Sequence, residues 1–209
     1  MMAGKNGLGT FIGQFAKYPM QLGTFAPSST RLARRMLENL KLEKADVVFE
    51  LGAGTGAITG EILKLIKPDA TFVAVEINSK MAAHLRSRFP GIHVVEDTAE
   101  KLGEFRRQNG IGLVDCMVCG VPWASFSEEE QDRLLMALEE NMRPGAQFAT
   151  LACVHSKWSR AAKRLRNELT QRFDGLHATR PVWCNMPPVF VYKCRSKGNG
   201  SRKPHQCRS

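Results

Sequence analysis

One stretch of the chain constrains its fold more than any other: the apolar run 47–51, followed by three glycines at alternate positions, Gly52, Gly54 and Gly56. The run predicts a buried parallel strand, and apolar residues at helical spacing over 57–66 predict a helix after the glycines. Glycines let a ligand approach the backbone, and the free N–H groups of a helix N-terminus attract a carboxylate or a phosphate. The stretch therefore predicts either a ligand-binding turn or a tight strand-to-helix connection without a ligand.

A second apolar run, 71–75, is followed by the acid Glu76. Glu76 lies about twenty residues beyond the last glycine, a spacing at which a strand-end carboxylate accepts hydrogen bonds from both hydroxyls of a ribose. The alternative is a solvated acid at the end of a strand. The glycine spacing, G-x-G-x-G, also differs from the dinucleotide fingerprint G-x-G-x-x-G.

The rest of the chain is expected to alternate between strands and helices, which predicts a doubly wound α/β fold with a mostly parallel sheet. Seven strands are expected, at 47–52, 71–77, 92–96, 112–119, 147–154, 176–182 and 189–194. Helices are expected at 57–66, 79–88, 127–141 and 158–171. Only the short segment 184–188 separates the last two strands, so they are expected to form an antiparallel hairpin at the C-terminal end of the sheet.

The composition fits one domain without a membrane-spanning segment, because 209 residues suit a single core and no apolar run reaches the length of a span. The net charge of +10 favours an anionic partner, either nucleic acid or a membrane surface. Cysteines within strand-like runs indicate reduced thiols in a cytosolic protein. Cys116 and Cys119 form a C-x-x-C, but residues three apart on a strand point to opposite faces, so no metal site is expected.

Three parts are expected along the chain. Residues 1–26 carry apolar side chains at helical spacing in Leu8, Phe11, Ile12 and Phe15, which predicts an amphipathic helix that either packs on the domain as a lid or lies in a lipid interface. Residues 27–195 form the α/β domain, whose first helix Ser28 or Ser29 can cap. Residues 196–209 are expected to be a disordered basic tail.

Several segments now support a resemblance to known families. The run Glu50 to Gly56 resembles the E-x-G-x-G-x-G motif of class I S-adenosylmethionine (SAM) methyltransferases. The segments 23–29, 120–123 and 185–192, in that order, resemble the bacterial phospholipid N-methyltransferases that convert phosphatidylethanolamine to phosphatidylcholine. The match runs over about 15–195, and the proline-rich segment 185–192 is its most specific part. The resemblance implies a Rossmann-like sheet and SAM as the cofactor.

The same resemblance implies a set of cofactor-binding residues. The glycine loop holds the methionine end of SAM, and Glu76 holds the ribose. Asp97 and Thr98, after the third expected strand, contact the adenine, although Asp97 can also cap the helix that follows. The cofactor-binding residues implied are Ser28, Ser29, Glu50, Gly52, Gly54, Gly56, Glu76, Ile77, Asp97, Thr98, Cys119 and Gly120.

The substrate side is expected where the fourth strand ends in Cys119-Gly120-Val121-Pro122-Trp123. Nucleobase amino methyltransferases carry an Asn or Asp acceptor where this chain has Cys119, which disfavours a base as the substrate. Aromatic faces can hold a methylated ammonium by cation–π attraction, and His155 can position or deprotonate an amine. The residues expected to contact the substrate are Tyr18, Trp123, His155, Trp183 and Asn185.

The sequence thus predicts a SAM-dependent phospholipid N-methyltransferase. It is expected to be a monomer in the cytoplasm, peripherally attached to the anionic inner face of the membrane, without a metal or a nucleic-acid partner. Three alternatives remain open. They are an RNA adenine N-methyltransferase, a methyltransferase of another amino lipid such as an ornithine lipid, and a non-catalytic module that binds SAM or lipid.

Overall fold

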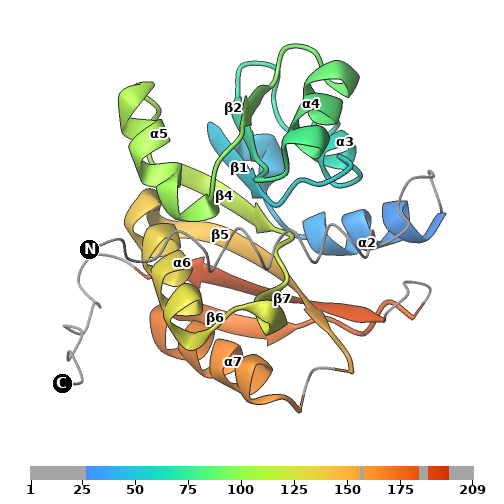
Figure 1. The fold of residues 1–209 in the computed structure, drawn as a ribbon, viewed down its shortest axis with the longest axis vertical. Helices are drawn as coiled ribbons and strands as arrows, with labels where there is room; N and C mark the ends of the chain where they lie inside the picture. Colours follow the sequence, from blue (N-terminus) through green and yellow to red (C-terminus); the bar gives the residue numbers. More distant parts are fainter. Residues whose placement is uncertain (1–26, 156–157, 184–187, 198–209) are drawn as a thin grey trace, which may run out of the picture.

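The computed structural model describes residues 27–155, 158–183 and 188–197, with side chains from Thr30 onward. Its described strands form one seven-stranded sheet in the order β3-β2-β1-β4-β5-β7-β6 (Figure 1). The strands are β1 Val47–Leu51, β2 Thr71–Val75, β3 His93–Val95, β4 Val114–Cys119, β5 Met142–Cys153, β6 Phe173–Ala178 and β7 Val189–Ser196. Strands β1 to β5 pair in parallel, and β7 is antiparallel to both β5 and β6. The predicted Rossmann-like fold class is therefore confirmed.

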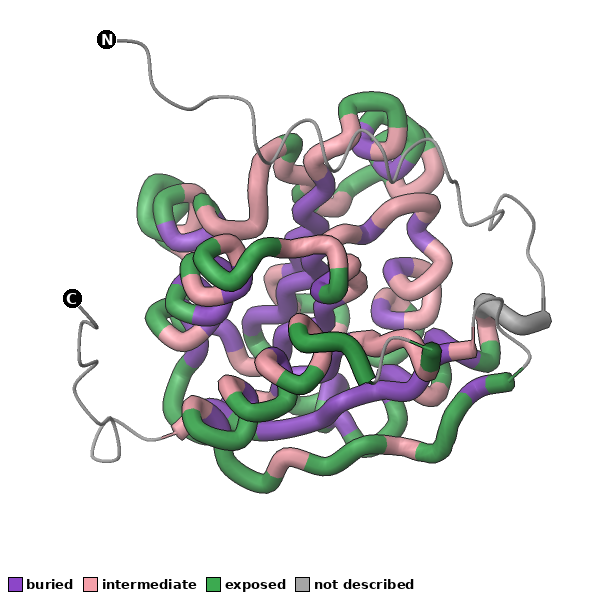
Figure 2. The backbone as a smooth tube through the Cα atoms, turned by 60° about the horizontal axis from the view of Figure 1, so that its bottom comes forward, coloured by how far each residue is buried: buried purple, intermediate pink, exposed green. Residues whose placement is uncertain are grey.

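Helices cover both faces of the sheet. The helices are α2 Pro27–Leu37, α3 Thr59–Ile62, α4 Ser79–Arg88, α5 Leu102–Gln108, α6 Glu128–Asn141 and α7 Arg160–Arg172, with short 3₁₀ turns η1 Leu42–Lys44, η2 Ala99–Lys101 and η3 Trp123–Ser125. One apolar cluster joins α5, α6 and α7 to one face of the sheet, and a second joins α2, η1, α3 and α4 to the other. Figure 2 shows the buried positions concentrated on the central strands and the exposed ones on the outer surfaces of the helices.

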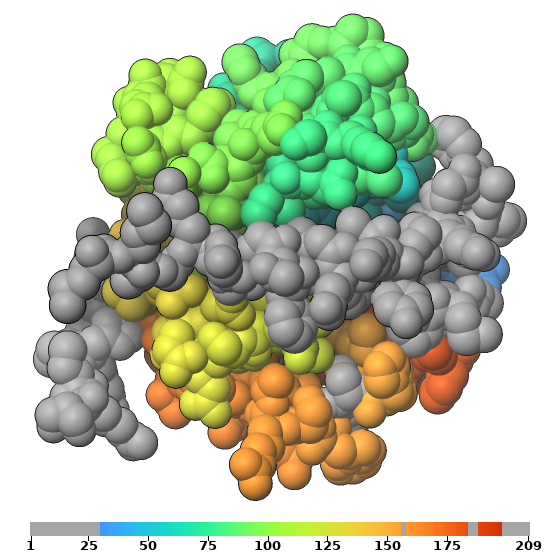
Figure 3. Space-filling model, in the orientation of Figure 1, coloured from blue at the N-terminus to red at the C-terminus, as the bar shows by residue number. Residues whose placement is uncertain are grey.

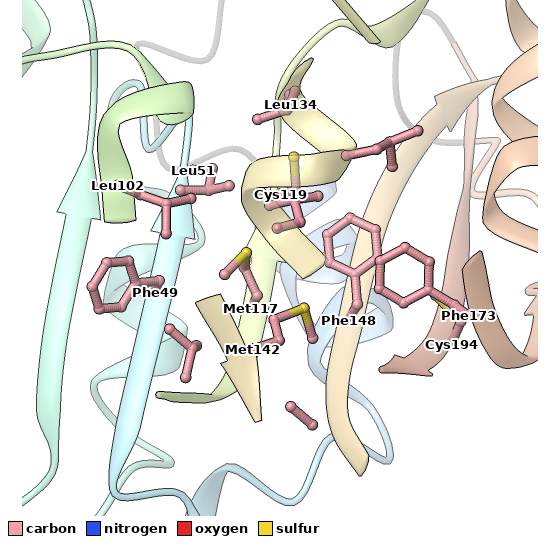
Figure 4. Close-up of a cluster of buried hydrophobic side chains, with 14 of the residues drawn as sticks. Phe49, Leu51, Leu102, Met117, Cys119, Leu134, Met142, Phe148, Phe173 and Cys194 are labelled. Atoms are coloured by element: carbon pink, nitrogen blue, oxygen red, sulfur yellow. The ribbon is translucent and has the colours of Figure 1, made fainter. Parts of the chain in front are cut away.

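Alternation along the central strands explains the two clusters, because successive side chains of a strand point to opposite faces. In β1, Phe49 and Leu51 belong to the first cluster and Val48 to the second. The close-up in Figure 4 shows part of the first cluster, in which the rings of Phe148 and Phe173 stack with their centroids 5.5 Å apart. The same alternation separates Cys116 from Cys119, which lie in different clusters.

Helix α2 is attached to the sheet through its apolar side and its C-terminal end. Its buried side chains are Leu32, Ala33, Met36 and Leu37. The ammonium group of Lys193, which β7 holds buried beneath this helix, donates a hydrogen bond to the carbonyl oxygen of Glu38. A lysine that binds a terminal helix carbonyl in this way also interacts favourably with the helix dipole.

Some predicted boundaries are wrong. The helix predicted at 57–66 is regular only over Thr59–Ile62 and continues as turns. The helix Leu102–Gln108 is not among the predicted helix ranges, although the possible cap at Asp97 anticipates a helix after it. Strand β5 starts at Met142, five residues earlier than predicted, because an irregular register lets Met142 pair with Val114 before the regular pairing begins at Gln147. Each of these differences depends on tertiary contacts rather than on local periodicity.

The last two strands form an antiparallel hairpin as predicted, but the connection between them is longer than predicted. Strand β6 ends at Ala178, and β7 begins at Val189, so the connection is longer than the predicted segment 184–188. The chain between them makes an isolated bridge from Val182 to Val189 and donates the Thr179 amide to the Val191 carbonyl. These contacts hold the connection against the end of the sheet.

Among the described helices, none is long and apolar enough to cross a bilayer. The predicted helix around Phe11, the site residues Tyr18 and Asn185, and nearly all of the predicted tail lie outside the described residues. Ser28 and Ser29 fall within α2, which already begins at Pro27, so the prediction that one of them caps this helix is wrong. Their side chains lie outside the described part. The other predictions that concern these residues stay predictions.

Candidate active site

The glycine loop leaves the carboxyl end of β1 and turns in the left-handed region three times. Gly52, Gly54 and Gly56 have φ values of 71°, 54° and 78°. The Gly52 amide donates to the Val75 carbonyl at 2.8 Å, and the Gly56 amide donates to the Ala53 carbonyl at 2.9 Å. The loop is thereby fixed across the ends of β1 and β2, at the edge where open α/β sheets bind their ligands.

The glycines at 54 and 56 serve different purposes. A Cβ atom added at Gly56 would lie 2.5 Å from the ring of Phe89 and 2.9 Å from Leu85, both on the α4 side of the loop. A Cβ added at Gly54 would meet no heavy atom within 4 Å. Gly56 is therefore required for packing, whereas Gly54 faces open space that a ligand can fill.

Glu76, directly after β2, is folded against this loop. Its Oε2 atom accepts the Gly54 amide at 2.8 Å, and its Oε1 atom accepts the Asn78 amide at 2.9 Å. The residue is 8% exposed, so its carboxylate is nearly covered by the two turns it joins. The structure thus brings the predicted ribose acceptor to the predicted glycine loop, and Ile77 follows it half-buried.

Glu50 is a buried acid with an unused acceptor. Its Oε2 atom accepts the Thr59 hydroxyl at 2.6 Å, while its Oε1 atom has no hydrogen-bond partner among the described residues. Burial raises the pKa of this carboxyl to about 8, the Thr59 hydrogen bond opposes the rise, and the negative charge of Glu76 adds to it. A buried carboxylate oxygen without a partner next to an open glycine loop fits a ligand that brings a positive charge.

The turn after β3 places two more predicted cofactor residues. Asp97 accepts the Thr98 amide at 2.7 Å through Oδ1 and the Lys101 ammonium at 3.1 Å through Oδ2. Thr98, not Asp97, occupies the N-cap position of η2, and it makes no capping hydrogen bond with its side chain. Both residues are partly exposed, so Asp97 keeps surface available for a ligand.

The end of β4 is locked by a chain of buried hydrogen bonds. The Trp123 indole donates to the Thr150 hydroxyl at 2.6 Å, and that hydroxyl donates to the Cys119 carbonyl at 3.0 Å. Gln131 of α6 donates to the Trp123 carbonyl at 3.0 Å, and the ring of Phe126 packs edge-on against the indole. Trp123 is only 3% exposed, so its ring fills the core in the structure and offers almost no free face.

Cys119 and Gly120 lie beside the glycine loop, but in different ways. The Gly120 amide donates to the Leu51 carbonyl at 2.8 Å, and a Cβ at Gly120 would lie 3.0 Å from the Gly52 carbonyl oxygen. The Cys119 side chain is fully buried, and burial raises the pKa of its thiol to about 11. Gly120 therefore provides a close backbone approach, and the Cys119 thiol faces the core cluster of α5 to α7.

The remaining substrate residues lie on the same edge of the sheet. His155 is exposed and follows β5, and Trp183 is 69% exposed in the connection between β6 and β7. Since β5 and β6 run in the same direction, both residues lie beyond the carboxyl ends of the strands, as the glycine loop does. The structure gives no contact between either of them and the loop.

Sequence reasoning missed three residues that shape this site. Thr59 holds Glu50, Thr150 holds Trp123, and Arg88 of α4 donates to the Thr55 carbonyl of the glycine loop at 2.7 Å. Arg88 and Thr55 lie 33 positions apart, and Thr150 lies 27 positions from Trp123. No local sequence pattern predicts such pairs, because only the order of the strands and helices in the fold brings the two residues together.

The comparisons with known proteins agree with this geometry. The profile of the family described as "Methyltransferase domain" matches residues 48–145, which run from β1 into β5. The N-methyltransferase NodS from Bradyrhizobium japonicum WM9 has the same fold, with a TM-score of 0.65 at 11% identity over 83% of this chain and 98% of that one. The chain belongs to the class I SAM-dependent methyltransferases, and SAM is its cofactor.

Two relatives match this chain over different shares of its length. A protein from Singulisphaera acidiphila named ornithine lipid N-methyltransferase is 33% identical over 188 residues, covering 88% of this chain and 94% of that protein. The dimethyladenosine transferase of Saccharomyces cerevisiae is also 33% identical, but only over 107 residues, covering 51% of this chain and 32% of that protein. The likeness to the first extends over nearly both whole chains, and the likeness to the second does not.

Proposed function

We propose that the chain transfers the methyl group of SAM to the primary amine of a membrane lipid head group. The observation that carries this proposal is the relative named as an ornithine lipid N-methyltransferase, to which the chain is similar over 94% of that protein's length. The segments 120–123 and 185–192 support an amino lipid as well, through their resemblance to phospholipid N-methyltransferases. Phosphatidylethanolamine and an ornithine lipid both present such an amine.

The cofactor residues follow from the site. SAM supplies an electrophilic methyl group on a sulfonium. Glu50, with its unpartnered Oε1, is proposed to hold the charged amino group of SAM. The open space at Gly54 is proposed to receive the rest of the methionine end of SAM. Glu76 is proposed to exchange its hydrogen bonds to the loop for the ribose hydroxyls, since it already lies at the Gly54 amide.

The chain must present the lipid amine without its extra proton. Such an amine has a pKa near that of lysine, about 10, so it is protonated in water. A site of low dielectric favours the neutral amine, whose lone pair can then be aligned with the methyl group. His155, exposed beyond β5, is proposed to orient the amine or take its proton.

Aromatic residues are proposed to hold the methylated ammonium. Trp183 is exposed beyond the sheet and can offer a ring face to a cation. Trp123 can do so only if the substrate reaches the small part of its ring that is not packed, because it is 3% exposed. Tyr18 and Asn185 stay candidates from the sequence alone.

An RNA base fits this site less well than a lipid amine. A nucleobase amine needs an acceptor at the end of β4, and the thiol of Cys119 is turned into the core. The aromatic that would stack on the base, Trp123, is tied to Thr150 inside the core. Both observations favour an aliphatic amine, which needs neither group.

A lipid substrate requires the protein to reach a bilayer surface. The basic charge of +10 favours an anionic surface, and no described helix is able to cross the bilayer. We therefore propose peripheral attachment to the inner face of the membrane, with the protein acting as a monomer in the cytoplasm. The N-terminal segment is proposed to take part, as the sequence predicts.

Label transfer tests the proposed function directly. The protein is incubated with methyl-labelled SAM and one of four acceptors: vesicles with phosphatidylethanolamine, vesicles with an ornithine lipid, vesicles of lipids without a primary amine, or ribosomal RNA. We expect label in one or both amino-lipid fractions and none in the others, and the better amino lipid identifies the head group. Label in RNA, or in no acceptor, would contradict the proposal. Glu76→Ala, checked for folding by circular dichroism, should transfer no label to any acceptor.

A further inference from the structure

Two tryptophans are the most exposed large apolar side chains among the described residues. Trp158 is 75% exposed and Trp183 is 69% exposed, whereas Leu65, the next in order, is 47% exposed. Burying an indole removes a large apolar area from water, so an exposed pair on one side of a molecule has a free-energy reason to be covered. A tryptophan also carries an N–H group that stays hydrated best at a boundary between apolar and polar surroundings.

Both tryptophans project from the carboxyl edge of the sheet. Trp158 lies between the end of β5 and the start of α7, and Trp183 follows Val182, which bridges to Val189. The amide of Val154, just after β5, donates to the carbonyl of Pro188, just before β7, at 2.9 Å. The end of β5 and the start of β7 therefore lie side by side, on the right in Figure 1, and orange and red atoms of these parts of the chain adjoin at the lower right of Figure 3.

The two chain segments that carry the tryptophans have basic residues and no acidic ones. Segments 154–167 and 175–197 contain no aspartate or glutamate. Arg160 and Lys163, in the first turn of α7, and Arg180, between β6 and β7, are exposed. Two acids of the neighbouring helix α6 are paired with Arg164 of α7, whose guanidinium lies 2.5 Å from Asp132 and 3.7 Å from Glu128.

We propose that Trp158, Trp183, Arg160, Lys163 and Arg180, which we call the tryptophan rim, dock on the head-group layer of an anionic bilayer. The indoles enter the boundary between head groups and acyl chains, where tryptophan is enriched in membrane proteins. Each basic residue near the surface adds attraction to anionic lipids.

Docking by the rim turns the carboxyl edge of the sheet toward the lipid. The glycine loop and His155 lie beyond the same edge, so a head group in the bilayer faces the site without leaving the membrane. The proposal rests on the proposed function for this consequence. A ring at head-group depth can also face a lipid ammonium, so insertion of Trp183 is compatible with its predicted contact with the substrate.

Quenching of tryptophan fluorescence by brominated lipids tests the tryptophan rim directly. The chain has three tryptophans, and Trp123 is buried, so quenching of the full-length protein by vesicles of brominated phosphatidylglycerol reports on Trp158 and Trp183. We expect strong quenching with anionic brominated vesicles and little with zwitterionic ones. Trp158→Ala with Trp183→Ala should remove the quenching and weaken vesicle partitioning by about tenfold. Leu65→Ala with Met136→Ala, which removes exposed apolar side chains elsewhere, should change neither.

The outcomes separate this proposal from the proposed function. Absence of quenching in the wild type, or equal partitioning of the rim variant, overturns the docking surface even if lipids are methylated. Quenching by RNA oligonucleotides in place of vesicles also overturns it, because the rim would then stack on bases. Trp158→Ala alone should slow methylation of lipid in vesicles and leave that of a monomeric short-chain amino lipid unchanged. If the wild type methylates no lipid in either form, the proposed function fails, whereas quenching still decides the rim.

Discussion

At the scale of single residues, the buried carboxyl of Glu50 makes stability depend on pH. Its pKa is about 8 in the folded protein, against 4.5 for the free side chain. The folded state therefore keeps a proton that the unfolded chain has released between these values, so this residue makes the protein less stable as the pH rises from about 4.5 to about 8. Burial of the carboxyl is the main cause of the raised pKa, and the unused oxygen Oε1 has no donor that would compensate the charge.

Glu50→Gln should remove this part of the pH dependence. We expect the variant and the wild type to have similar free energies of unfolding near pH 5, and the variant without cofactor to be the more stable by on the order of 2–4 kcal/mol near pH 9. Urea unfolding at a series of pH values measures the difference. Parallel curves over the whole range would contradict the prediction. Calorimetry should also show weaker SAM binding by the variant, since its amide cannot pair with the cofactor's ammonium.

Thr150 satisfies the buried indole N–H of Trp123 and is itself fully buried. Thr150→Val keeps the shape but leaves the indole donor without a partner, so we expect a loss of about 1–3 kcal/mol in the free energy of unfolding. Thr150→Ser keeps the hydroxyl and should lose less, only the contacts of one methyl group. Urea denaturation compares the two variants. An equal loss in both would show that the hydrogen bond contributes nothing beyond packing.

At the scale of elements, the glycine loop combines packing and ligand access in one turn. Both Gly54 and Gly56 have positive φ, so alanine at either position costs about 1–2 kcal/mol of stability. Gly56→Ala should cost about 1–3 kcal/mol more, because its Cβ meets Phe89 and Leu85. Thermal unfolding without cofactor measures which of the two variants loses more stability.

The affinity for SAM tests the role of Gly54 separately from its effect on stability. Gly54→Ala places a methyl group in the open space of the loop, so we expect it to fold and to lose most of its SAM affinity in calorimetry. Wild-type affinity in folded Gly54→Ala would remove the loop from the cofactor site. The sequence predicts this outcome for Gly54, and the structure adds the reason why Gly56 differs.

Helices α6 and α7 are joined by a nearly buried arginine. The Arg172 guanidinium lies 2.8 Å from Glu139, 2.8 Å from Glu168 and 3.3 Å from Asp132, and its side chain is 9% exposed. Arg172→Met leaves three acids close together without this cation, so we expect a loss of about 2–4 kcal/mol in the free energy of unfolding. Arg133→Ala breaks the exposed pair with Glu100 and should cost less than about 1 kcal/mol. Similar losses in both variants, measured in urea, would contradict the prediction.

At the scale of the whole molecule, attachment to a bilayer has two proposed contributors, the tryptophan rim and the N-terminal segment. The segment lies outside the described residues, and its apolar stripe over Leu8, Phe11, Ile12 and Phe15 is known from the sequence. Such a short stripe gives weak insertion alone, and nearby basic residues strengthen it at an anionic surface. Two weak contributors together give a reversible attachment.

Phe11→Glu with Phe15→Glu should reduce sedimentation with anionic vesicles and leave SAM binding intact. Vesicle binding of the wild type should weaken as salt increases, because exposed charges are screened. The matched control is Phe11→Leu with Phe15→Leu, which keeps the stripe apolar. Unchanged sedimentation of the glutamate variant would make the segment a packed lid, and attachment would then rest on the rim or on the basic tail.

The sequence by itself determined the parts of this protein that depend on neighbours along the chain. Strand, glycine turn and helix follow from local periodicity and from the backbone freedom of Gly52, Gly54 and Gly56. The meeting of Glu76 with the loop follows from the parallel pairing of adjacent strands, which needs only the order β1 then β2. Alternation along β4 likewise predicted that Cys116 and Cys119 face opposite sides.

Only the tertiary structure decided which way the remaining side chains are used. Trp123 looks like an open aromatic in the sequence, but β5 brings Thr150 beside it and the indole becomes part of the core. In the sequence, Glu50 is only the acid that opens the glycine motif. In the structure, Thr59 binds one of its oxygens and leaves the other unpartnered. The longer path from β6 to β7 exposes Trp183 beside the edge that also carries Trp158. These outcomes depend on which strands lie side by side, and no local spacing contains that information.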